Sequence, residues 1–326
     1  MKSPSFWYGE KNSVSAILAP LSAVYTNLGR RHRRRSQPKK LAIPVICVGN
    51  IVSGGSGKTP TALALVKLLR DSKISLSPFF LTRGYRGKIE GPERVDDSHD
   101  PDLWGDEALL LSRHAPTIVS KNRFAGGLLA QNLEADLIIM DDGMQNYTLS
   151  KDVTFCIVNG KMGFGNENVI PQGPLRQPLN DGYALSDAFI LIGADERGIT
   201  SNLPEGKPIF KASLKTVEGQ KISKETPYIA FCGIGYPEKF KASLDESGLT
   251  IKDFKSFGDH HTYSPKDIAE LSNMASAQNA RLITTEKDFA RLPDFFQKDL
   301  IDVLSVEIVF ENPDAITTFI KSKINR

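Results

Sequence analysis

The amino-acid sequence predicts an α/β protein with a mostly parallel sheet covered by helices on both faces, like that of P-loop nucleotide-binding proteins. It also predicts a second, smaller α/β unit and an N-terminal membrane-associating helix. From Leu41 onward, short apolar segments alternate with helical patterns, which is typical of parallel strands joined by helices. A polar, lysine-rich stretch at 213–225 separates two sets of such segments. We therefore expect an N-terminal segment at 1–40, a larger domain at 41–222 and a smaller C-terminal domain at 223–326.

Size and composition agree with a two-domain globular protein. The 326 residues leave room for two compact domains, and 40% hydrophobic with 24% charged residues is an ordinary composition. The net charge of +3 is too small to predict a nucleic-acid partner. Cys47, Cys156 and Cys232 lie far apart without the spacing of a metal site or a disulfide framework, which indicates a reducing compartment.

The N-terminal segment combines an apolar run with basic residues. The run at 13–28 is shorter than the roughly 20 apolar residues that span a bilayer. Arginines and lysines crowd into 30–40, after the run, and no small-residue cleavage site follows, unlike a secretory signal. This order suits the surface of an anionic membrane, with aromatic anchors at 6–8. The alternative is a helix packed on the protein's own core with a solvated basic loop. No nucleic-acid recognition motif accompanies the arginines.

The remaining elements follow from apolar periodicity. In the larger domain we expect strands at 43–48, 78–81, 117–119, 137–140, 153–158 and 188–192, with helices at 59–69 and 122–133 among the connections. In the smaller domain we expect strands at 228–231, 251–257, 282–284 and 306–310, with helices at 237–244, 265–277 and 313–321.

A glycine-rich loop follows the first of these strands. Its backbone N–H groups and the next helix N-terminus favour a bound polyphosphate. Lys58 would neutralise the β- and γ-phosphates, and the Thr59 hydroxyl would ligate Mg²⁺. The strict pattern has glycine where this chain has Val52. The alternative is a turn that only joins strand to helix. The candidate nucleotide-binding residues are Gly54, Gly55, Ser56, Gly57, Lys58, Thr59 and Pro60.

Three further clusters carry acidic or histidine side chains. Asp141 and Asp142 end an apolar strand, where a carboxylate holds Mg²⁺ in nucleotide-binding sheets; a plain Asp-Gly turn is the alternative. Asp106 begins a predicted helix and could be an N-terminal helix charge. His260 and His261 follow an aspartate, an arrangement suited to a proton relay or to loop polarity before the next helix. Spacing alone does not bring Asp106 and His260 together.

These clusters belong to a series of motifs whose order resembles the tetraacyldisaccharide 4′-kinase family. The motifs are GNIVSGGSGKTP at 49–60, LTRGYRG at 81–87, WGDEALLL at 104–111, DDGMQN at 141–146, GFGN at 163–166, PQGPLR at 171–176, AFCGIGYPEKF at 230–240, FGDHHTY at 257–263 and TTEKD at 284–288. The resemblance runs from the N-terminal apolar segment to Asp288, which is nearly the whole chain.

The resemblance implies an ATP- and Mg²⁺-dependent kinase of lipid A biosynthesis at the cytoplasmic face of the bacterial inner membrane. Its acceptor would be the 4′-hydroxyl of a tetraacyldisaccharide 1-phosphate held in the anionic membrane, and no protein partner is implied. By the same resemblance Asp106 is the base, paired with His260, with His261 as the reserve choice. The family's basic positions correspond to Arg83, Arg123 and Arg176 as candidate phosphate or substrate contacts.

Two departures and two alternatives accompany this interpretation. The acidic-pair motif of the family usually continues with histidine where this chain has Asn146, and position 52 is usually threonine. One alternative is a membrane-recruited deviant P-loop ATPase switch, which would hydrolyse ATP without a small acceptor and would not need the Asp-His-His motif. A non-catalytic nucleotide-binding module is the other, although Lys58, Thr59 and the acidic pair oppose it. We expect the active site in the cleft between the domains, at the carboxyl ends of the strands.

Overall fold

The computed structural model describes residues 4–9, 13–96, 100–217, 222–235, 237–258, 261–293 and 298–324. The chain divides into two compact units. The N-terminal unit consists of Ser3–Ser213 and Ile308–Arg326, and the C-terminal unit contains Leu214–Glu307. The boundaries therefore differ from those that we expected, because the end of the chain, assigned to a domain at 223–326, returns to the N-terminal unit.

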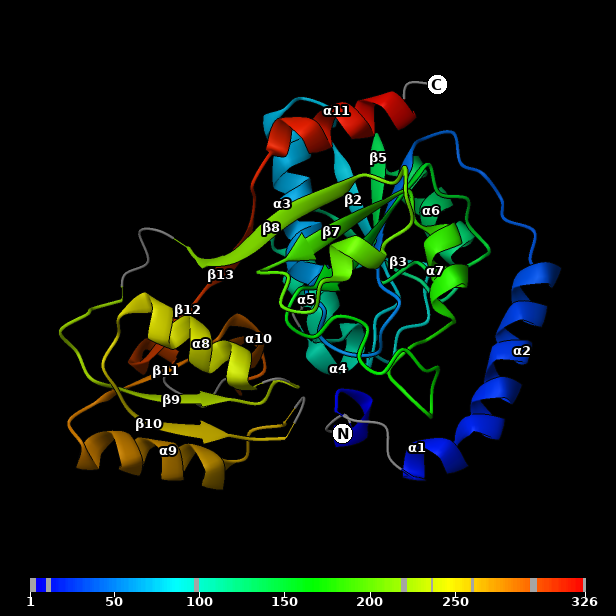
Figure 1. Cartoon of the computed structure of the whole chain (residues 1–326). Coiled ribbons are helices and arrows are strands. Elements are labelled where there is room, and N and C mark those ends of the chain that lie inside the picture. The colour runs from blue at the N-terminus through cyan, green and yellow to red at the C-terminus, as the bar shows by residue number, and fades with distance from the viewer. Residues whose placement is uncertain are drawn as a thin grey trace. The chain divides into compact units, whose positions relative to one another are not determined.

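A nine-stranded sheet in the order β13-β8-β7-β6-β1-β5-β2-β4-β3 forms the centre of the N-terminal unit (Figure 1). The strands from β8 to β4 in this order run parallel to one another, and β3 is antiparallel to β4. The strands are β1 Val45–Gly49, β2 Pro78–Thr82, β3 Glu93–Arg94, β4 Thr117–Val119, β5 Leu137–Asp141, β6 Val153–Asn159, β7 Ala188–Ile192, β8 Ile209–Thr216 and β13 Val306–Phe310. Every residue of β1, β2 and β5 is buried, as expected for continuous apolar strands covered on both faces.

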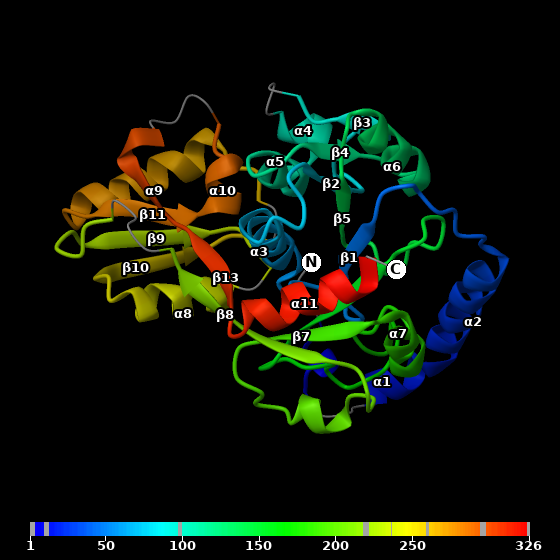
Figure 2. The ribbon, with the colours of Figure 1, turned by 90° about the horizontal axis from the view of Figure 1, so that it is seen from above.

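Helices cover both faces of this sheet (Figure 2). The helix α3 contacts β1, β5 and α11, while α6 contacts β2 and β4. The helices α3 and α5 contact each other on one face, whereas apolar residues of α6 and α7 join one core cluster on the other (Figure 2). The helices are α3 Lys58–Asp71, α4 Pro101–Trp104, α5 Asp106–Ser112, α6 Arg123–Asn132, α7 Leu179–Leu185, the short 3₁₀ helix η2 Ile199–Asn202, and α11 Pro313–Ile324.

The N-terminal segment is helical and packs on the N-terminal unit through one face. It comprises η1 Ser5–Trp7, α1 Ser13–Ile17 and α2 Ala19–Arg35. The helix therefore continues through the basic cluster, which we had expected to follow it. The hydroxyl of Ser22, a buried residue, donates to the carbonyl oxygen of Val169 at 2.8 Å and accepts from the backbone N–H of Gln172 at 3.1 Å. These bonds fix α2 to the 166–176 segment, and the Ser15 hydroxyl of α1 donates to the carbonyl oxygen of Gln172 in the same segment at 3.2 Å.

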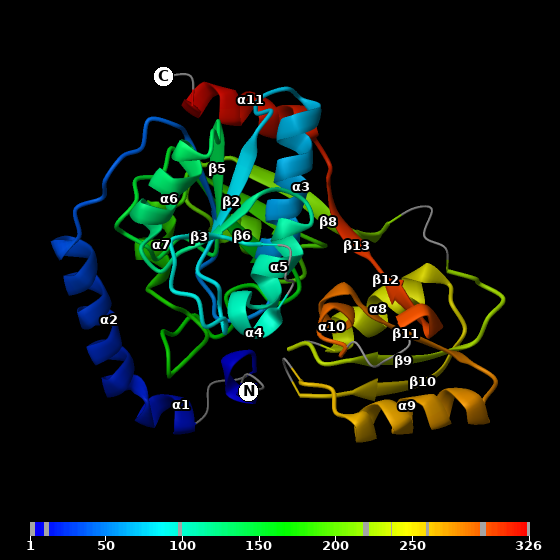
Figure 3. The ribbon, with the colours of Figure 1, turned by 180° about the vertical axis from the view of Figure 1, so that it is seen from behind.

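The C-terminal unit is a four-stranded parallel sheet in the order β10-β9-β11-β12 (Figure 3). Its strands are β9 Tyr228–Cys232, β10 Ile251–Ser256, β11 Arg281–Thr285 and β12 Ile301–Leu304, and its helices are α8 Pro237–Ser247, α9 Pro265–Ala277, α10 Glu286–Ala290 and the 3₁₀ helix η3 Lys298–Leu300. Apolar residues of α9 pack on one face of the sheet and those of α8 on the other. A capping box between Ser264 and Asp267 begins α9 as the Ser-Pro-x-Asp sequence predicts.

The expected linker at 213–225 is the clearest error in the assignment of elements. Strand β8 continues to Thr216, into a stretch whose lysine-rich composition, including Lys215, suggested a linker. Because β8 lies between β7 and β13 near the edge of the sheet, its lysine side chains reach solvent, and the strand does not have the apolar run of a central one. Strand β13 was predicted correctly as an element, but it joins the sheet of the N-terminal unit.

Candidate functional site

The glycine-rich loop joins β1 to α3 in a conformation that leaves the start of the helix open. Gly57 is the N-cap residue, with a left-handed φ of 97°, and no side chain of the described residues caps the helix there. The backbone angle is what favours glycine here, because a Cβ atom at Gly57 would meet only the end of the Ile192 side chain, at 2.7 Å from its Cδ1. The N–H groups of the first turn of α3 are therefore available to an anion.

Side chains from neighbouring segments hold the loop. Asn50 is fully buried, and its amide donates to Ser56 Oγ at 2.7 Å. The side chain of Gln145 donates to the carbonyl oxygen of Asn50 at 2.8 Å. Val52 forms an antiparallel bridge with Leu175, so the residue that breaks the strict glycine pattern is a buried part of this pairing. The loop is thus fixed by the protein before any ligand binds.

Asp141, the last residue of β5, has a buried carboxylate, and its two oxygens have different environments. The Thr59 hydroxyl donates to its Oδ2 at 2.9 Å. Its Oδ1 is buried and has no hydrogen-bond partner within the described residues. Burial, followed by the negative charges of Glu107 and Asp142, raises the pKa of Asp141 to about 7. A buried, unpaired carboxylate oxygen beside a hydroxyl is the hard-oxygen environment that Mg²⁺ prefers.

Asp142 has a different environment although it is adjacent in sequence. It has a left-handed φ of 52°. Arg176 donates to its Oδ1 at 2.7 Å, and Lys58 Nζ lies 3.7 Å from the same oxygen. Burial alone would raise the pKa of Asp142, but the positive charges of Lys58 and Arg176 hold it below its usual value. In turn, burial lowers the pKa of Lys58 despite the attraction of Asp142.

Two further arginines lie near the acidic pair. Arg123, the first residue of α6, is 4% exposed and donates to the carbonyl oxygen of Ser120. Its Nε is buried without a hydrogen-bond partner in the described part of the chain. Burial and then the positive charge of Arg83 lower the pKa of Arg123 to about 10. Arg83 itself is exposed directly after β2. Both arginines are thus placed where an added anion would be attracted.

The Gly-Asp-Glu motif adds a carboxylate that sequence reasoning missed. Asp106 is the half-buried first residue of α5, after Gly105 with a φ of 82°. The neighbouring Glu107 exerts the largest electrostatic effect on the pKa of Asp141, and it also raises that of Lys58. The signal was present in the sequence, because Glu107 adjoins Asp106, but adjacency alone does not show which acid faces the phosphate loop.

The histidine pair belongs to the C-terminal unit. His260 and the preceding Asp259 lie outside the described residues. The Nε2 of His261 is 3.1 Å from Asp267 Oδ2, and its ring stacks on Phe257 with 4.6 Å between centroids. One ring nitrogen of His261 therefore already has a partner at the start of α9.

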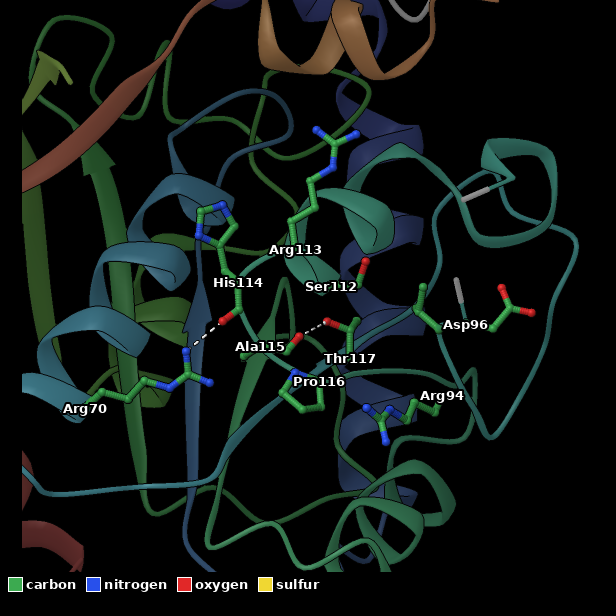
Figure 4. Close-up of a pocket in the computed structure, with 10 residues that line it drawn as sticks. Arg70, Arg94, Asp96, Ser112, Arg113, His114, Ala115, Pro116 and Thr117 are labelled. Carbon is green, nitrogen blue, oxygen red and sulfur yellow. Dashed lines mark hydrogen bonds between the residues drawn. The ribbon is translucent and has the colours of Figure 1, made fainter. Parts of the chain in front are cut away.

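A separate pocket of about 280 Å³ lies at the amino end of β4 (Figure 4). Arg70, Arg94 and Arg113 are among its lining residues, and the Arg70 guanidinium donates to the carbonyl oxygen of His114 at 2.7 Å. The glycine-rich loop and Asp141 lie at the carboxyl ends of the parallel strands, which is the opposite edge of the sheet. We therefore do not include this pocket in the candidate site.

The comparisons with known proteins match this chain over almost its full length. A family model described as "Tetraacyldisaccharide-1-P 4'-kinase" matches residues 14–325. This chain belongs to that kinase family. A tetraacyldisaccharide 4′-kinase of Paramagnetospirillum magneticum is 44% identical over 97% of both chains. One of Rhodospirillum rubrum is 40% identical over 98% of this chain and 97% of its own.

A solved structure of the kinase family has a similar fold. It is a crystal structure titled as an "apo" form of LpxK from Aquifex aeolicus in complex with ATP. The TM-score is 0.77 at 27% identity, and the match covers 95% of this chain and 99% of that one. The α/β fold with a mostly parallel sheet that we predicted is thereby confirmed.

One departure from the usual kinase motif has a local explanation. The Oδ1 of Asn146 accepts from the backbone N–H of Thr148 at 3.2 Å and from its hydroxyl at 2.9 Å. Such a closed turn is a common use of asparagine. Its neighbour Met144 is fully buried and so close to Gly49 that a Cβ there would lie 2.5 Å from Met144 Cβ. Asn146 thus stabilises the turn after the acidic pair.

The helix α2 of this kinase leaves apolar side chains in solvent. Leu21 is 58% exposed, Val24 57% and Leu28 62%. Their spacing places them on one face of α2, opposite the face that carries Ser22. Among the described residues, no helix combines the length and the apolar character that crossing a bilayer requires.

Proposed function

We propose that this protein transfers the γ-phosphate of ATP to the 4′-hydroxyl of a tetraacyldisaccharide 1-phosphate, a step of lipid A biosynthesis. Family membership supports the reaction, and one observation supports its site. The open N-terminus of α3 presents Lys58 and Thr59 beside Asp141, whose buried Oδ1 lacks a hydrogen-bond partner within the described residues. A polyphosphate with its cation supplies the charges that this arrangement leaves unmatched.

We assign the glycine-rich loop to the phosphates of ATP. The residues Gly54, Gly55, Ser56, Gly57, Lys58, Thr59 and Pro60 would surround them with backbone N–H groups. Lys58, the first residue of α3, has its ammonium 3.7 Å from Asp142 Oδ1 and would stabilise charge on the transferring phosphoryl group. Arg176 pairs with the same Asp142 and holds it in place. These groups act mainly by positioning and electrostatics.

We assign Mg²⁺ to Thr59 and Asp141, with Asp142 next to them. When bound, the ion neutralises charge on the phosphate oxygens. The described residues contain no cluster of three or more His, Cys, Asp or Glu side chains suited to a metal. That fits Mg²⁺, which keeps several waters and takes the other ligands from the nucleotide phosphates. Of the two aspartates, Asp141 is the better direct ligand, because Asp142 already has two cationic partners.

We infer that Asp106 takes the proton of the acceptor hydroxyl and that His260 assists it. For the choice of histidine, the Nε2 contact of His261 with Asp267 supports His260, since His261 already has a structural partner. Arg83 and Arg123 are candidate contacts for substrate phosphate. The buried, unpartnered Nε of Arg123 supports that role.

We propose further that α2 holds the enzyme on the cytoplasmic face of the bacterial inner membrane. The apolar residues of α2 face away from Ser22, and His32 and three arginines occupy its last turn. Each basic residue near an anionic surface contributes about 1 kcal/mol, so these charges reinforce a shallow apolar contact. A lipid acceptor that stays in the bilayer would then reach the enzyme by diffusion within the plane of the membrane.

The experiment that tests the function supplies the purified full-length protein with labelled ATP and tetraacyldisaccharide 1-phosphate in mixed micelles. We expect label on the lipid and none without Mg²⁺. Phosphate released only to water, at a rate that the lipid does not change, would contradict the kinase assignment and favour a membrane-recruited ATPase switch. The variant with Lys58→Ala is the negative control for the site.

A further inference from the structure

The TTEKD motif at 284–288 has no role in the mechanism above, yet it ends in a buried charge. Asp288 is 0% exposed. Its Oδ1 accepts from the backbone N–H of Gly233 at 2.8 Å and from the Tyr263 hydroxyl at 2.8 Å, and it lies 3.2 Å from Arg291 Nη2. Its Oδ2 accepts from the Thr285 hydroxyl at 2.7 Å. A buried carboxylate is tolerated when its oxygens are paired in this way, and losing one partner is costly.

The partners of Asp288 come from the ends of three adjacent strands. Gly233 follows β9, Tyr263 lies in the connection after β10, and Asp288 itself lies in α10 directly after β11. These strands are neighbours in the order β10-β9-β11 and are parallel. Asp288 therefore joins three connections at the carboxyl edge of the sheet, the edge where ligands bind in α/β folds.

The same contacts reach the histidine-bearing segment at 257–263. The ring of Tyr263 packs edge-on against His261, with 5.1 Å between centroids, and His261 stacks on Phe257. The backbone N–H of His261 donates to the carbonyl oxygen of Gly258 at 3.1 Å, within the same segment. A Cβ atom at Gly233 would lie 3.0 Å from His261 Cβ and 3.1 Å from Asp288 Oδ1.

We propose that Asp288 is a positioning residue for phosphoryl transfer, which fixes the histidine-bearing segment through Tyr263 and Gly233. Its carboxylate holds the Tyr263 hydroxyl on one side and the backbone after β9 on the other. The kinetic consequence rests on the proposed function of the histidine pair, whereas the contacts themselves do not.

The test replaces Asp288 by asparagine and, separately, Tyr263 by phenylalanine. The second change keeps all ring contacts and removes one hydroxyl, so it remains informative if Asp288→Asn fails to fold. We expect kcat for lipid phosphorylation to fall by about 10²-fold in Asp288→Asn, the effect of misplacing a reacting group by roughly 1 Å. The KM for ATP should stay at its wild-type value, because the nucleotide site belongs to the N-terminal unit.

A matched control comes from the opposite end of the same sheet. Asp302 pairs with Arg281, the first residue of β11, at 2.8 Å. Asp302→Asn removes an arginine partner in the same unit but at the amino end of the strands, and we expect it to leave kcat unchanged. An equal loss of kcat in Asp302→Asn and Asp288→Asn would overturn the proposal, because the effect would then be general destabilisation of the unit.

Two more readouts separate this proposal from the proposed function. The double variant Asp288→Asn/His260→Ala should have nearly the same kcat as His260→Ala alone, because the effects of groups that act as a unit are not additive. Fully additive losses of kcat would overturn the proposal. The NMR chemical shifts of the His261 ring, which depend on its stacking on Phe257, should change in Tyr263→Phe and not in Asp302→Asn. If the wild type transfers no phosphate to lipid, the proposed function fails, while unchanged His261 shifts would refute the positioning contacts.

Discussion

Replacing Asp141 by asparagine should stabilise the metal-free protein while abolishing its activity. The carboxylate is buried beside Glu107 and Asp142, and its Oδ1 has no hydrogen-bond partner among the described residues. Asparagine keeps an oxygen for the Thr59 hydroxyl and removes the charge. Since that charge is what Mg²⁺ requires, the same change should prevent phosphoryl transfer.

The size of the effect follows from the pKa of Asp141, which the fold raises from 3.8 to about 7. Below pH 3.8 both folded and unfolded chains carry the proton, and the raised pKa costs nothing. Between these values the folded chain binds more protons than the unfolded chain, so stability falls as pH rises. Above pH 7 the raised pKa lowers the free energy of unfolding by its full amount. That amount is about 4 kcal/mol, because each pKa unit of the shift corresponds to about 1.36 kcal/mol.

The decisive quantity is how the stability gained by Asp141→Asn depends on pH. By the same linkage relation, the wild-type cost is about 2 kcal/mol at pH 5 and about 4 kcal/mol at pH 8, so the advantage of Asp141→Asn should grow by roughly 2 to 3 kcal/mol between these pH values. For a unit of this size that corresponds to a difference in Tm on the order of 10 °C. Any pH-independent cost of the new amide cancels in this comparison.

Thermal unfolding in EDTA, followed by tryptophan fluorescence, measures the stability of the N-terminal unit, which contains Asp141. Both tryptophans, Trp7 and Trp104, belong to the N-terminal unit. Asp142→Asn is the matched control with the opposite sign, because Lys58 and Arg176 lower the pKa of Asp142, and its charge stabilises the fold above its unfolded pKa. A gain for Asp141→Asn that is the same at pH 5 and pH 8 would refute the reasoning.

Three further predictions concern the reaction and the membrane. Lys58→Ala should lower kcat by about 10²–10³-fold in a folded protein, as measured by phosphate transfer to lipid, and near-normal turnover would rule out the phosphate-loop assignment. Asp106→Ala should lower the chemical step by roughly 10²–10⁴-fold without weakening ATP binding by calorimetry, and it should be non-additive with His260→Ala; a collapse of ATP affinity would instead assign Asp106 to the metal or the fold. Leu21→Glu with Val24→Glu should reduce co-sedimentation with anionic vesicles while micellar activity persists, and unchanged sedimentation would remove α2 as the anchor.

The parallel strands were predictable because burial on both faces leaves a simple pattern. Strands β4, β7 and β13 have the bounds that apolar runs predicted. Strand β8 was missed because a position next to the edge strand allows lysines within it. The return of β13 to the first sheet was not predictable either, since a strand's apolar pattern does not record which neighbour it pairs with.

The motifs indicated candidate residues, but not the different environments that the fold gives them. Asp141 and Asp142 are identical and adjacent, so sequence left the direct Mg²⁺ ligand open. The fold distinguishes them through one backbone angle: Asp141 completes β5, whereas the left-handed φ of Asp142 directs the chain so that its carboxylate meets Lys58 and Arg176. Glu107 was overlooked for a similar reason, since its influence on Asp141 depends on how α5 packs beside α3.

The segment at 166–176 shows why motif order alone gives an incomplete account of this protein. Through Val169 and Gln172 it bonds Ser22 of α2, the helix with the exposed apolar face. A few residues later, Leu175 bridges Val52 of the glycine-rich loop and Arg176 pairs with Asp142. One short segment therefore contacts both the helix proposed to lie on the membrane and the loop proposed to hold phosphate. Its mixed polar and apolar composition, with two prolines and one glycine, is that of an ordinary surface loop. Only its contacts reveal that it supports two elements with proposed functions.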